Sequence, residues 1–431
     1  MDEAGREDGN SFCFLPCLFC YKITAHTVMK YIVLIGDGMA DKPLRELGGR
    51  TPLQAALTPN MDKLASRGLC GMVKTIPNGF DPGSDVANMS VLGYDPAVYY
   101  SGRAPLEAAS MGVELSEDDV AYRCNLVSLR YDKQSTSAYM EDYSAGHIET
   151  RYSRGLIDAL SEYMREPGIS FHPGISYRHL MIWHHGESEA RCTPPHDITG
   201  KNIKDHLPSG PGSDFLKLLM RKSVDILQSQ EYNWKRFEEG KNPANSIWLW
   251  GQGRKPRLPA FSEKYGLKGA MVSAVDLTKG LAICAGMDVL DVPGVTGYLD
   301  TNYEGKADYA LKALAGDTDF VYIHVEAPDE AGHMGKYLDK IQAIEDFDNR
   351  VVGRVMFGAR SLGDHRILLM PDHPTPIEAK THTSDPVPFV IYDSTAPIEG
   401  SKVSYDEEIS RMDDIMKLES GHKLLDYLIK G

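Results

Sequence analysis

The sequence lacks an excess of basic residues, long apolar runs and a regular arrangement of cysteines. Its 431 residues carry 46 Lys and Arg against 61 Asp and Glu, and the formal charge of −15 argues against a surface that follows nucleic-acid phosphates. No apolar run is long enough to span a bilayer, and the first residues lack the basic segment and uninterrupted apolar core of a secretory signal. The cysteines are spaced irregularly, which favours a reduced compartment. We therefore expect a cytoplasmic protein that binds neither nucleic acid nor membrane.

Residues 1–28 differ in pattern from the rest of the chain. Cys13, Cys17 and Cys20, with Phe19 beside the last of them, have the spacing of iron–sulfur ligands in radical-SAM enzymes. Nothing after them resembles the barrel that such enzymes need, and a strong strand pattern begins directly after Met29. We expect residues 1–28 to be a disordered N-terminal extension, with the iron–sulfur site as the alternative.

Three apolar segments predict strands buried on both faces of a parallel sheet. They are Lys30–Gly36, Asp319–Val325 and His365–Met370, and Pro386–Tyr392 predicts one more strand. Helical patterns over Thr58–Gly68 and 336–359 complete the alternation that is typical of α/β proteins. Each of the three buried strands stops shortly before acidic residues, and ligands bind at the carboxyl ends of strands in open α/β sheets. We expect Asp37, Asp372 and the region of Asp329 to converge there.

The middle of the chain predicts a second domain. With 42% hydrophobic residues, the chain has room for two or three domain cores. Between residues 101 and 285 the pattern changes to mixed polar segments with aromatic and basic clusters. We therefore assign 101–285 to an inserted substrate-binding domain, and 29–100 with 286–431 to one discontinuous outer domain.

Carboxylates and imidazoles in the outer domain have the spacing of metal ligands. Asp329 and His333 are four residues apart, which places both on one face of a helical turn. Alone, such a pair is more often two surface neighbours. Asp372 and His373 follow a buried strand, however, and His382 precedes the next. Mixed carboxylate and imidazole ligands suit Mn²⁺ or Zn²⁺, whereas an all-oxygen set would favour Mg²⁺ or Ca²⁺.

Ser84, in Gly83-Ser-Asp85, has two interpretations. A serine after glycine at a helix start is commonly an N-cap. A serine beside divalent metal ions can instead be activated as a nucleophile. The neighbouring ligand pattern favours the nucleophile.

Together these motifs resemble the archaeal-type cofactor-independent phosphoglycerate mutases of the alkaline phosphatase superfamily, from about Met29 to the end. The resemblance rests on Ile35–Met39, Gly83–Asn88, Leu92–Pro96, Ser101–Glu107, Asp329 with His333, Asp372-His373 and His382. It implies a three-layer α/β/α domain with a smaller inserted α/β domain.

The resemblance also implies the site. One metal ion would be held by Asp329, His333 and His382, and a second by Asp37, Asp372, His373 and the Ser84 oxygen. Mn²⁺ is the expected metal, with Mg²⁺ and Zn²⁺ as alternatives. Ser84 would take the phosphoryl group of 3-phosphoglycerate and return it to the 2-hydroxyl, through a phosphoserine, in glycolysis and gluconeogenesis.

Substrate contacts and competing activities complete the expectations. His147, Arg178, Arg254 and Lys279 are the candidates for binding phosphoglycerate, although each could be a solvated surface charge. A non-standard homoserine kinase is the second interpretation. It ranks below the mutase because the sequence contains no Gly-x4-Gly-Lys-Ser/Thr loop for a nucleotide donor. A metal-dependent phosphatase is the third. A non-catalytic binding module would be expected to have lost some of the metal ligands, and every expected ligand position is filled here. The sequence does not determine the oligomeric state.

Overall fold

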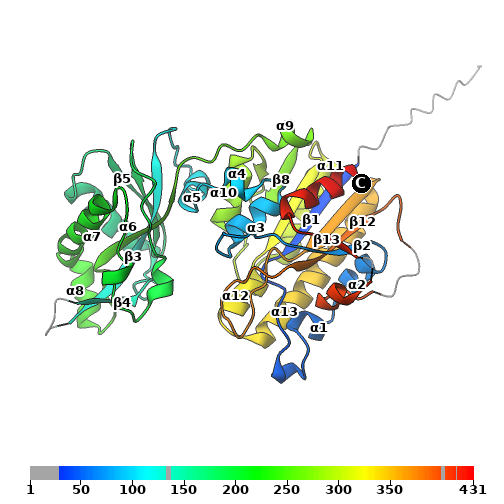
Figure 1. Ribbon diagram of the computed structural model, residues 1–431, viewed down its shortest axis with the longest axis horizontal. Helices are drawn as coiled ribbons and strands as arrows, with labels where there is room; N and C mark the ends of the chain where they lie inside the picture. The colour runs from blue at the N-terminus through cyan, green and yellow to red at the C-terminus, as the bar shows by residue number, and fades with distance from the viewer. Residues whose placement is uncertain (1–28, 133–136, 399–402, 414) are drawn as a thin grey trace, which may run out of the picture.

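The computed structural model describes residues 29–132, 137–398, 403–413 and 415–431, which form two lobes (Figure 1). The expected extension at residues 1–28 lies outside these ranges. Within the described residues, no helix is both long and apolar enough to cross a membrane.

An eight-stranded sheet forms the centre of the large lobe, in the order β13-β2-β12-β11-β1-β10-β8-β9. The strand β1 (Lys30–Gly36) lies between β10 (Phe320–Val325) and β11 (His365–Met370) and is parallel to both. The other strands are β2 (Leu69–Val73), β8 (Gly269–Val272), β9 (Asp288–Val289), β12 (Val387–Asp393) and β13 (Met416–Leu418). The strand β12 is antiparallel to both neighbours, so the sheet is mixed.

Helices cover both faces of this sheet, which confirms the predicted α/β class. Ile32 and Leu34 of β1 pack into one apolar cluster, whereas Val33 and Ile35 pack into another on the opposite face. This double burial explains the continuous apolar pattern of the strand. The first cluster includes α2 (Pro59–Ala65), α11 (Tyr303–Ala315), α13 (Tyr337–Asp346) and α14 (Gly353–Gly358); the second includes α3 (Ser84–Val91), α10 (Asp276–Cys284) and α15 (Leu424–Lys430).

The helix predicted over 336–359 contains a wider turn. A π-helical stretch, Phe347–Val352, separates α13 from α14. It carries the buried Asp348, whose carboxylate accepts hydrogen bonds from the backbone N–H of Met61 at 2.7 Å and from the side chain of Asn60 at 2.9 Å. The π-helical turn therefore carries the carboxylate that holds the first residues of α2.

The small lobe contains a separate antiparallel sheet. Its strands are β3 (Val120–Tyr131), β4 (Ala138–Asp142), β5 (Ile169–Ile175), β6 (Arg178–Trp183) and β7 (Ser246–Gly253). They are ordered β4-β3-β6-β5, with β7 also paired to β3. The helices α6 (Thr150–Tyr163) and α7 (Ser213–Gln228) pack on one face, and α5 (Ala104–Ser110) packs on the other.

The far boundary of the insertion differs from the expected residue 285. The strand β8 pairs with β10, and β9 pairs with β8, so both belong to the large sheet. The chain crosses between lobes near Ser101 and Arg254, where Ser101 Oγ donates to Arg254 O at 2.6 Å. The backbones approach so closely there that a Cβ on Gly253 would lie 1.9 Å from Ser101 O. The strand β8 has only four residues, which is too short to give a recognisable strand pattern within the mixed polar sequence around it. The sequence therefore did not indicate that it belongs to the large sheet.

Candidate functional site

Three acidic residues meet at the carboxyl edge of the large sheet. Asp37 directly follows β1, and Asp372 is the second residue after β11. Asp329 belongs to α12 (Ala327–His333), which begins shortly after β10. Because β10, β1 and β11 are adjacent and parallel, their ends bring these distant residues together.

Asp329, His333 and His382 form the first group, here called the Asp329 cluster. His333 Nε2 lies 3.2 Å from Asp329 Oδ2, and His382 Nε2 lies 3.4 Å from Asp329 Oδ1. The two Nε2 atoms are 2.9 Å apart. One carboxylate and two imidazoles thus point their donor atoms at a common point.

The tautomers of the two histidines fit a metal ion. His333 Nδ1 lies 3.0 Å from Lys380 O, and His382 Nδ1 lies 3.4 Å from Pro82 O. A carbonyl oxygen only accepts hydrogen bonds, so the protons belong on the two Nδ1 atoms. The Nε2 lone pairs then face each other beside a carboxylate. Lone pairs at this distance repel unless a cation or a proton lies between them, so the Asp329 cluster fits a cation.

The second group, called the Asp37 cluster, comprises Asp37, His324, Asp372 and His373, each at most 2% exposed. Asp37 Oδ2 lies 3.1 Å from His324 Nε2, and His373 Nε2 lies 3.5 Å from an oxygen of both Asp37 and Asp372. Burial raises the pKa of Asp37 well above its ordinary value, and the carboxylates of Asp372 and Asp329 raise it further. Asp37 Oδ1 is buried without a hydrogen-bond partner. Buried carboxylates this close fit a divalent cation, which would compensate their charge.

Ser84 lies beside the Asp37 cluster. It is the first residue of α3, and Gly83 occupies the N-cap position that was the alternative role for Ser84. Ser84 Oγ is 3.0 Å from His373 Nε2. Asn88, one turn later, donates to Ser84 O at 2.8 Å and to Asp372 Oδ2 at 2.7 Å. The helix N-terminus favours negative charge at this position, as on a phosphorylated serine.

Thr375 connects the two clusters. Its Oγ1 donates to Asp329 Oδ1 at 2.5 Å and lies 3.3 Å from His373 Nδ1. Because the hydroxyl proton is directed to the carboxylate, His373 donates from Nδ1. Its Nε2 lone pair is then free to face Ser84 and Asp372.

The structure brings together the residues that the sequence predicted as metal ligands. They are Asp37, Ser84, Asp329, His333, Asp372, His373 and His382. His324, which was not predicted, joins Asp37 and Asp372 in one group of possible ligands. The signal for it is a histidine within the otherwise apolar and aromatic strand Phe320–Val325.

Two of the four substrate-binding candidates lie on one side of the small lobe. His147 contacts the rings of Tyr143 and Tyr177, with centroids 6.4 and 5.9 Å apart. The guanidinium of Arg178 lies 5.8 Å from the ring centroid of Tyr177. His196 adds a ring 6.1 Å from Tyr143. We call these five residues the small-lobe face.

The small-lobe face is directed toward α12 of the large lobe. Partial desolvation lowers the pKa of His196 although its side chain is still 48% exposed, and the charge of His333 contributes to that lowering. Burial raises the pKa of Glu326 to about 8 and also raises that of Glu330, and the charge of Arg178 opposes both changes. Charges on the two lobes therefore act on one another across the site.

The other two candidates are placed differently. Burial lowers the pKa of Lys306 to about 8, and the charge of Lys279, on α10, contributes to that lowering. Lys306 Nζ in turn donates to His324 O at 2.7 Å, so Lys306 lies against a residue of the Asp37 cluster. Arg254 instead donates to Asp118 O at 2.6 Å and to Gly186 O at 2.9 Å. These bonds fix the connection between the lobes and do not favour Arg254 as a substrate ligand.

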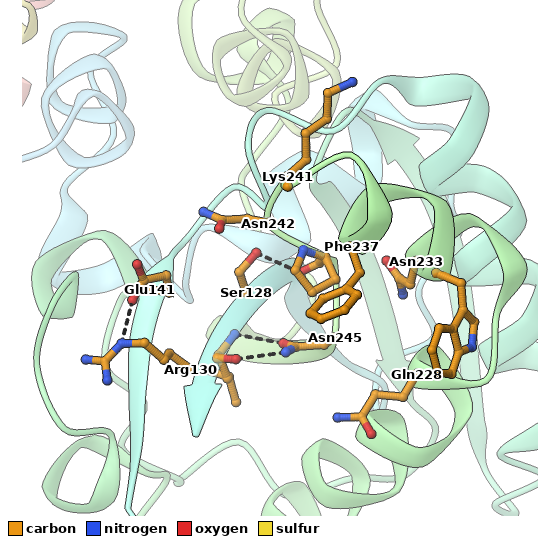
Figure 2. A pocket seen from close by; sticks show the side chains of 13 residues that line it. Ser128, Arg130, Glu141, Gln228, Asn233, Phe237, Lys241, Asn242 and Asn245 are labelled. Carbon is orange, nitrogen blue, oxygen red and sulfur yellow. Dashed lines mark hydrogen bonds and ion pairs between the residues drawn. The ribbon is translucent and has the colours of Figure 1, made fainter. Parts of the chain in front are cut away.

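A cavity of about 580 Å³ lies elsewhere, between β3, β4 and α8 (Glu231–Glu238), at the end of the small lobe remote from α12 (Figures 1 and 2). Exposed Trp234 and Phe237 line it. The amide of Asn245 is already bonded to the backbone N–H and C=O of Leu129, at 2.7 and 2.8 Å. None of the predicted site residues lines this cavity, so it is not the candidate active site.

Comparison with known sequences points to one family. The family described as 2,3-bisphosphoglycerate-independent phosphoglycerate mutase matches residues 65–233. A protein of that name from Methanosarcina acetivorans is 54% identical, over 93% of this chain and 100% of its own length. A second, from Methanothermobacter thermautotrophicus, is 50% identical over 93% of this chain and 97% of its own.

Solved structures support the same fold. The PH0037 protein from Pyrococcus horikoshii has a TM-score of 0.75 and 30% identity, with 93% of this chain and 97% of that chain covered. The cofactor-independent phosphoglycerate mutase from Thermoplasma acidophilum has a TM-score of 0.61 and 28% identity, with 93% and 99% covered. Both lobes are therefore shared with these proteins.

Proposed function

Because the chain belongs to the 2,3-bisphosphoglycerate-independent phosphoglycerate mutase family, we propose that it interconverts 3-phosphoglycerate and 2-phosphoglycerate with Ser84 as phosphoryl carrier. The observation that carries this proposal is the position of Ser84 Oγ, 3.0 Å from Nε2 of the buried His373 of the Asp37 cluster. The reaction is a step of glycolysis and gluconeogenesis, and we expect it in the cytoplasm.

The two clusters would hold two divalent cations, for which Mn²⁺ is our first choice. The Asp329 cluster would hold one, and the Asp37 cluster with Ser84 would hold the other. Bound cations of this kind neutralise phosphoryl oxygens and lower the pKa of a coordinated hydroxyl. His324 joins the predicted ligands because its Nε2 faces Asp37.

Ser84 would carry the phosphoryl group through two balanced half-reactions. In the first, the Ser84 Oγ–P bond forms while the bond from phosphorus to the C3 oxygen breaks, and the proton displaced from Ser84 ends on the C3 oxygen. In the second, the bond from phosphorus to the C2 oxygen forms while the Ser84 Oγ–P bond breaks, and the proton of the C2 hydroxyl ends on Ser84 Oγ. No donor or acceptor beyond glycerate is needed. The positive end of α3 stabilises the negative charge of the phosphoserine.

The small lobe would retain glycerate between the two half-reactions. The charge of Arg178 acts on Glu326 of the large lobe, His147 lies beside Tyr177 on the small-lobe face, and Lys279 lies near Lys306. The guanidinium of Arg178, the imidazole of His147 and the ammonium of Lys279 would bind the anionic groups of the substrate. Closure of the small lobe over the site would also keep water from hydrolysing the phosphoserine.

An isotope experiment separates this proposal from its alternatives. Phosphate labelled on 3-phosphoglycerate should appear on 2-phosphoglycerate without added 2,3-bisphosphoglycerate, with little inorganic phosphate released. Acid quench and mass spectrometry should find phosphoserine at Ser84. Dominant inorganic phosphate would indicate a phosphatase, and strict dependence on ATP with homoserine as acceptor would indicate the kinase. A phosphohistidine in place of phosphoserine would overturn the role of Ser84.

A further inference from the structure

Tyr322 is a fully buried residue of β10, two positions before His324. Alternate residues of a strand point to the same face of a sheet, so Tyr322 shares with His324 the face that α3 covers. The hydroxyl of Tyr322 donates to Asn88 Oδ1, on α3, at 2.5 Å. The strand β10 therefore contributes one side chain to the Asp37 cluster and another to the helix that carries Ser84.

The side-chain amide of Asn88 is buried and has one orientation. Its Nδ2 donates to Ser84 O at 2.8 Å and to Asp372 Oδ2 at 2.7 Å. A backbone carbonyl cannot donate a hydrogen bond, so the nitrogen of the amide has to face Ser84 O. The amide oxygen then faces Tyr322, whose hydroxyl is the donor. Both hydrogens of the amide are thus used, and the hydroxyl of Tyr322 fixes the amide on its other side.

Asp372 is the predicted metal ligand that this amide holds. Its Oδ1 accepts hydrogen bonds from the backbone N–H groups of Gly38 at 3.1 Å and His373 at 2.9 Å. Its Oδ2 accepts the hydrogen bond from Asn88 and lies 3.5 Å from His373 Nε2. A carboxylate oxygen has two lone pairs, so one lone pair of Oδ2 is left for a cation. The backbone therefore fixes one oxygen of Asp372, and Asn88 fixes the other.

Asn88 also connects Asp372 to the nucleophile. The two hydrogen bonds from Nδ2 join the backbone of Ser84 to the carboxylate of Asp372 through a single planar group. A rotation of this amide would change both contacts together. Without the hydroxyl of Tyr322, the buried Oδ1 would lose its donor, and such a rotation would be favoured. Groups that orient a metal ligand in this way affect both metal affinity and turnover.

A second buried tyrosine shows what the packing of the large lobe requires by itself. Tyr303, the first residue of α11, is also fully buried, and its hydroxyl has no hydrogen-bond partner. The fold thus accommodates a buried tyrosine hydroxyl that is unpaired. The hydroxyl of Tyr322, in contrast, belongs to a continuous chain of hydrogen bonds that ends at Ser84 and Asp372.

We propose that Tyr322 is a positioning residue for phosphoryl transfer, which holds Ser84 and Asp372 in their relative position through Asn88. This inference rests on the proposed function, because it assumes that Ser84 carries the phosphoryl group. Since Tyr322 acts through Asn88, it should influence the rate of transfer and the cation at Asp372, and it should leave capture of the substrate by the small lobe unchanged. Transfer depends on such positioning because a displacement of about 1 Å can lower a rate by about 100-fold.

The test compares Tyr322→Phe with the matched control Tyr303→Phe, which removes a hydroxyl that has no partner. With saturating Mn²⁺, Tyr322→Phe should lower kcat for 3-phosphoglycerate by about 10- to 100-fold and leave KM within about twofold. Tyr303→Phe should change neither constant by more than about twofold. Calorimetry should show that Tyr322→Phe, but not Tyr303→Phe, weakens the binding of one Mn²⁺ ion by about tenfold or more. The double variant of Tyr322→Phe with Asn88→Ala should be no slower than Asn88→Ala alone.

Other results would overturn the inference. Equal effects of the two Phe variants would give Tyr322 a packing role only, and an unchanged kcat or a rise in KM alone would exclude positioning. Effects that multiply in the double variant would show that Tyr322 does not act through Asn88. If Tyr322→Phe does not fold, Asn88→Ala should itself lower kcat with KM unchanged, and a wild-type kcat in that variant would refute the inference. A wild type that does not isomerise phosphoglycerate would refute the proposed function, and the Mn²⁺ affinities would still decide whether Tyr322 positions Asp372.

Discussion

In the large lobe the functional side chains are buried and bonded to one another, whereas in the small lobe most of them are exposed and held by ring contacts. Asp372 and His373 are fully buried, and Asp372 accepts hydrogen bonds from the Gly38 backbone and the Asn88 side chain. His147 and Arg178, by contrast, are exposed and contact Tyr177. A fixed, desolvated site suits bond making, and an exposed cationic face suits capture of an anion. Substitutions in the large lobe should therefore affect turnover and metal binding, and those in the small lobe should affect affinity.

Removal of divalent cations should have the largest effect, because both large-lobe clusters need compensation for buried carboxylates. Prolonged incubation with excess chelator should abolish mutase activity, and Mn²⁺ should restore it in an enolase-coupled assay. Full activity in excess chelator would contradict the two-cation interpretation. His382→Ala should weaken Mn²⁺ binding measured by calorimetry, while the melting temperature of the metal-free protein stays unchanged. If that variant unfolds, His382 is structural.

Loss of the nucleophile should be nearly as severe. Ser84→Ala should lower kcat by about 10⁴-fold or more, as for other covalent relays. Its affinity for 3-phosphoglycerate should stay within a few-fold of the wild type, since the proposed small-lobe contacts and most metal ligands remain. Calorimetry and single-turnover kinetics separate these effects. Retained turnover with the same phosphate transfer would exclude Ser84 as carrier.

A buried ion pair behind the large-lobe clusters gives the third prediction. Lys340 and Asp41 are both fully buried, and Lys340 Nζ donates to Asp41 Oδ2 at 2.7 Å and to Thr375 O at 2.8 Å. Lys340→Met should lower the free energy of unfolding by about 3–5 kcal/mol, because it leaves Asp41 buried and unpaired. Chemical denaturation measures the change, and Lys312→Met on the exposed side of α11 is the control. A similarly small loss of unfolding free energy in both variants would show that the Lys340–Asp41 pair does not stabilise the fold.

The smallest effect is expected in the small lobe. His147→Ala should raise KM for 3-phosphoglycerate by about tenfold, the order of one lost hydrogen bond to a charged group, with kcat within about twofold. His206→Ala, in a short helical turn elsewhere in the small lobe, is a suitable control. A fall in kcat with unchanged KM would break the contrast between the lobes, because it would assign His147 to the chemistry.

Much of the large lobe could be predicted from the sequence. The strand Lys30–Gly36 was predicted with the bounds that the structure has, because a strand buried on both faces has an unbroken apolar pattern. The acidic and histidine residues were predicted because strand ends are followed directly by polar ligands. The small lobe was harder to predict, since short antiparallel strands with mixed surfaces resemble loops in sequence.

The sequence by itself determined the α/β class, the order of the buried strands along the chain and the chemical types of the ligands, since these depend on local pattern. Only the tertiary structure decided which residues meet. His324 joins Asp37 because β10 lies beside β1, and Tyr322 meets Asn88 because α3 packs on that face of the sheet. Tertiary contacts also decided that Arg254 donates hydrogen bonds to backbone carbonyls and that β8 belongs to the large sheet. Contacts between residues far apart in the chain depend on strand order and register, which local sequence does not encode.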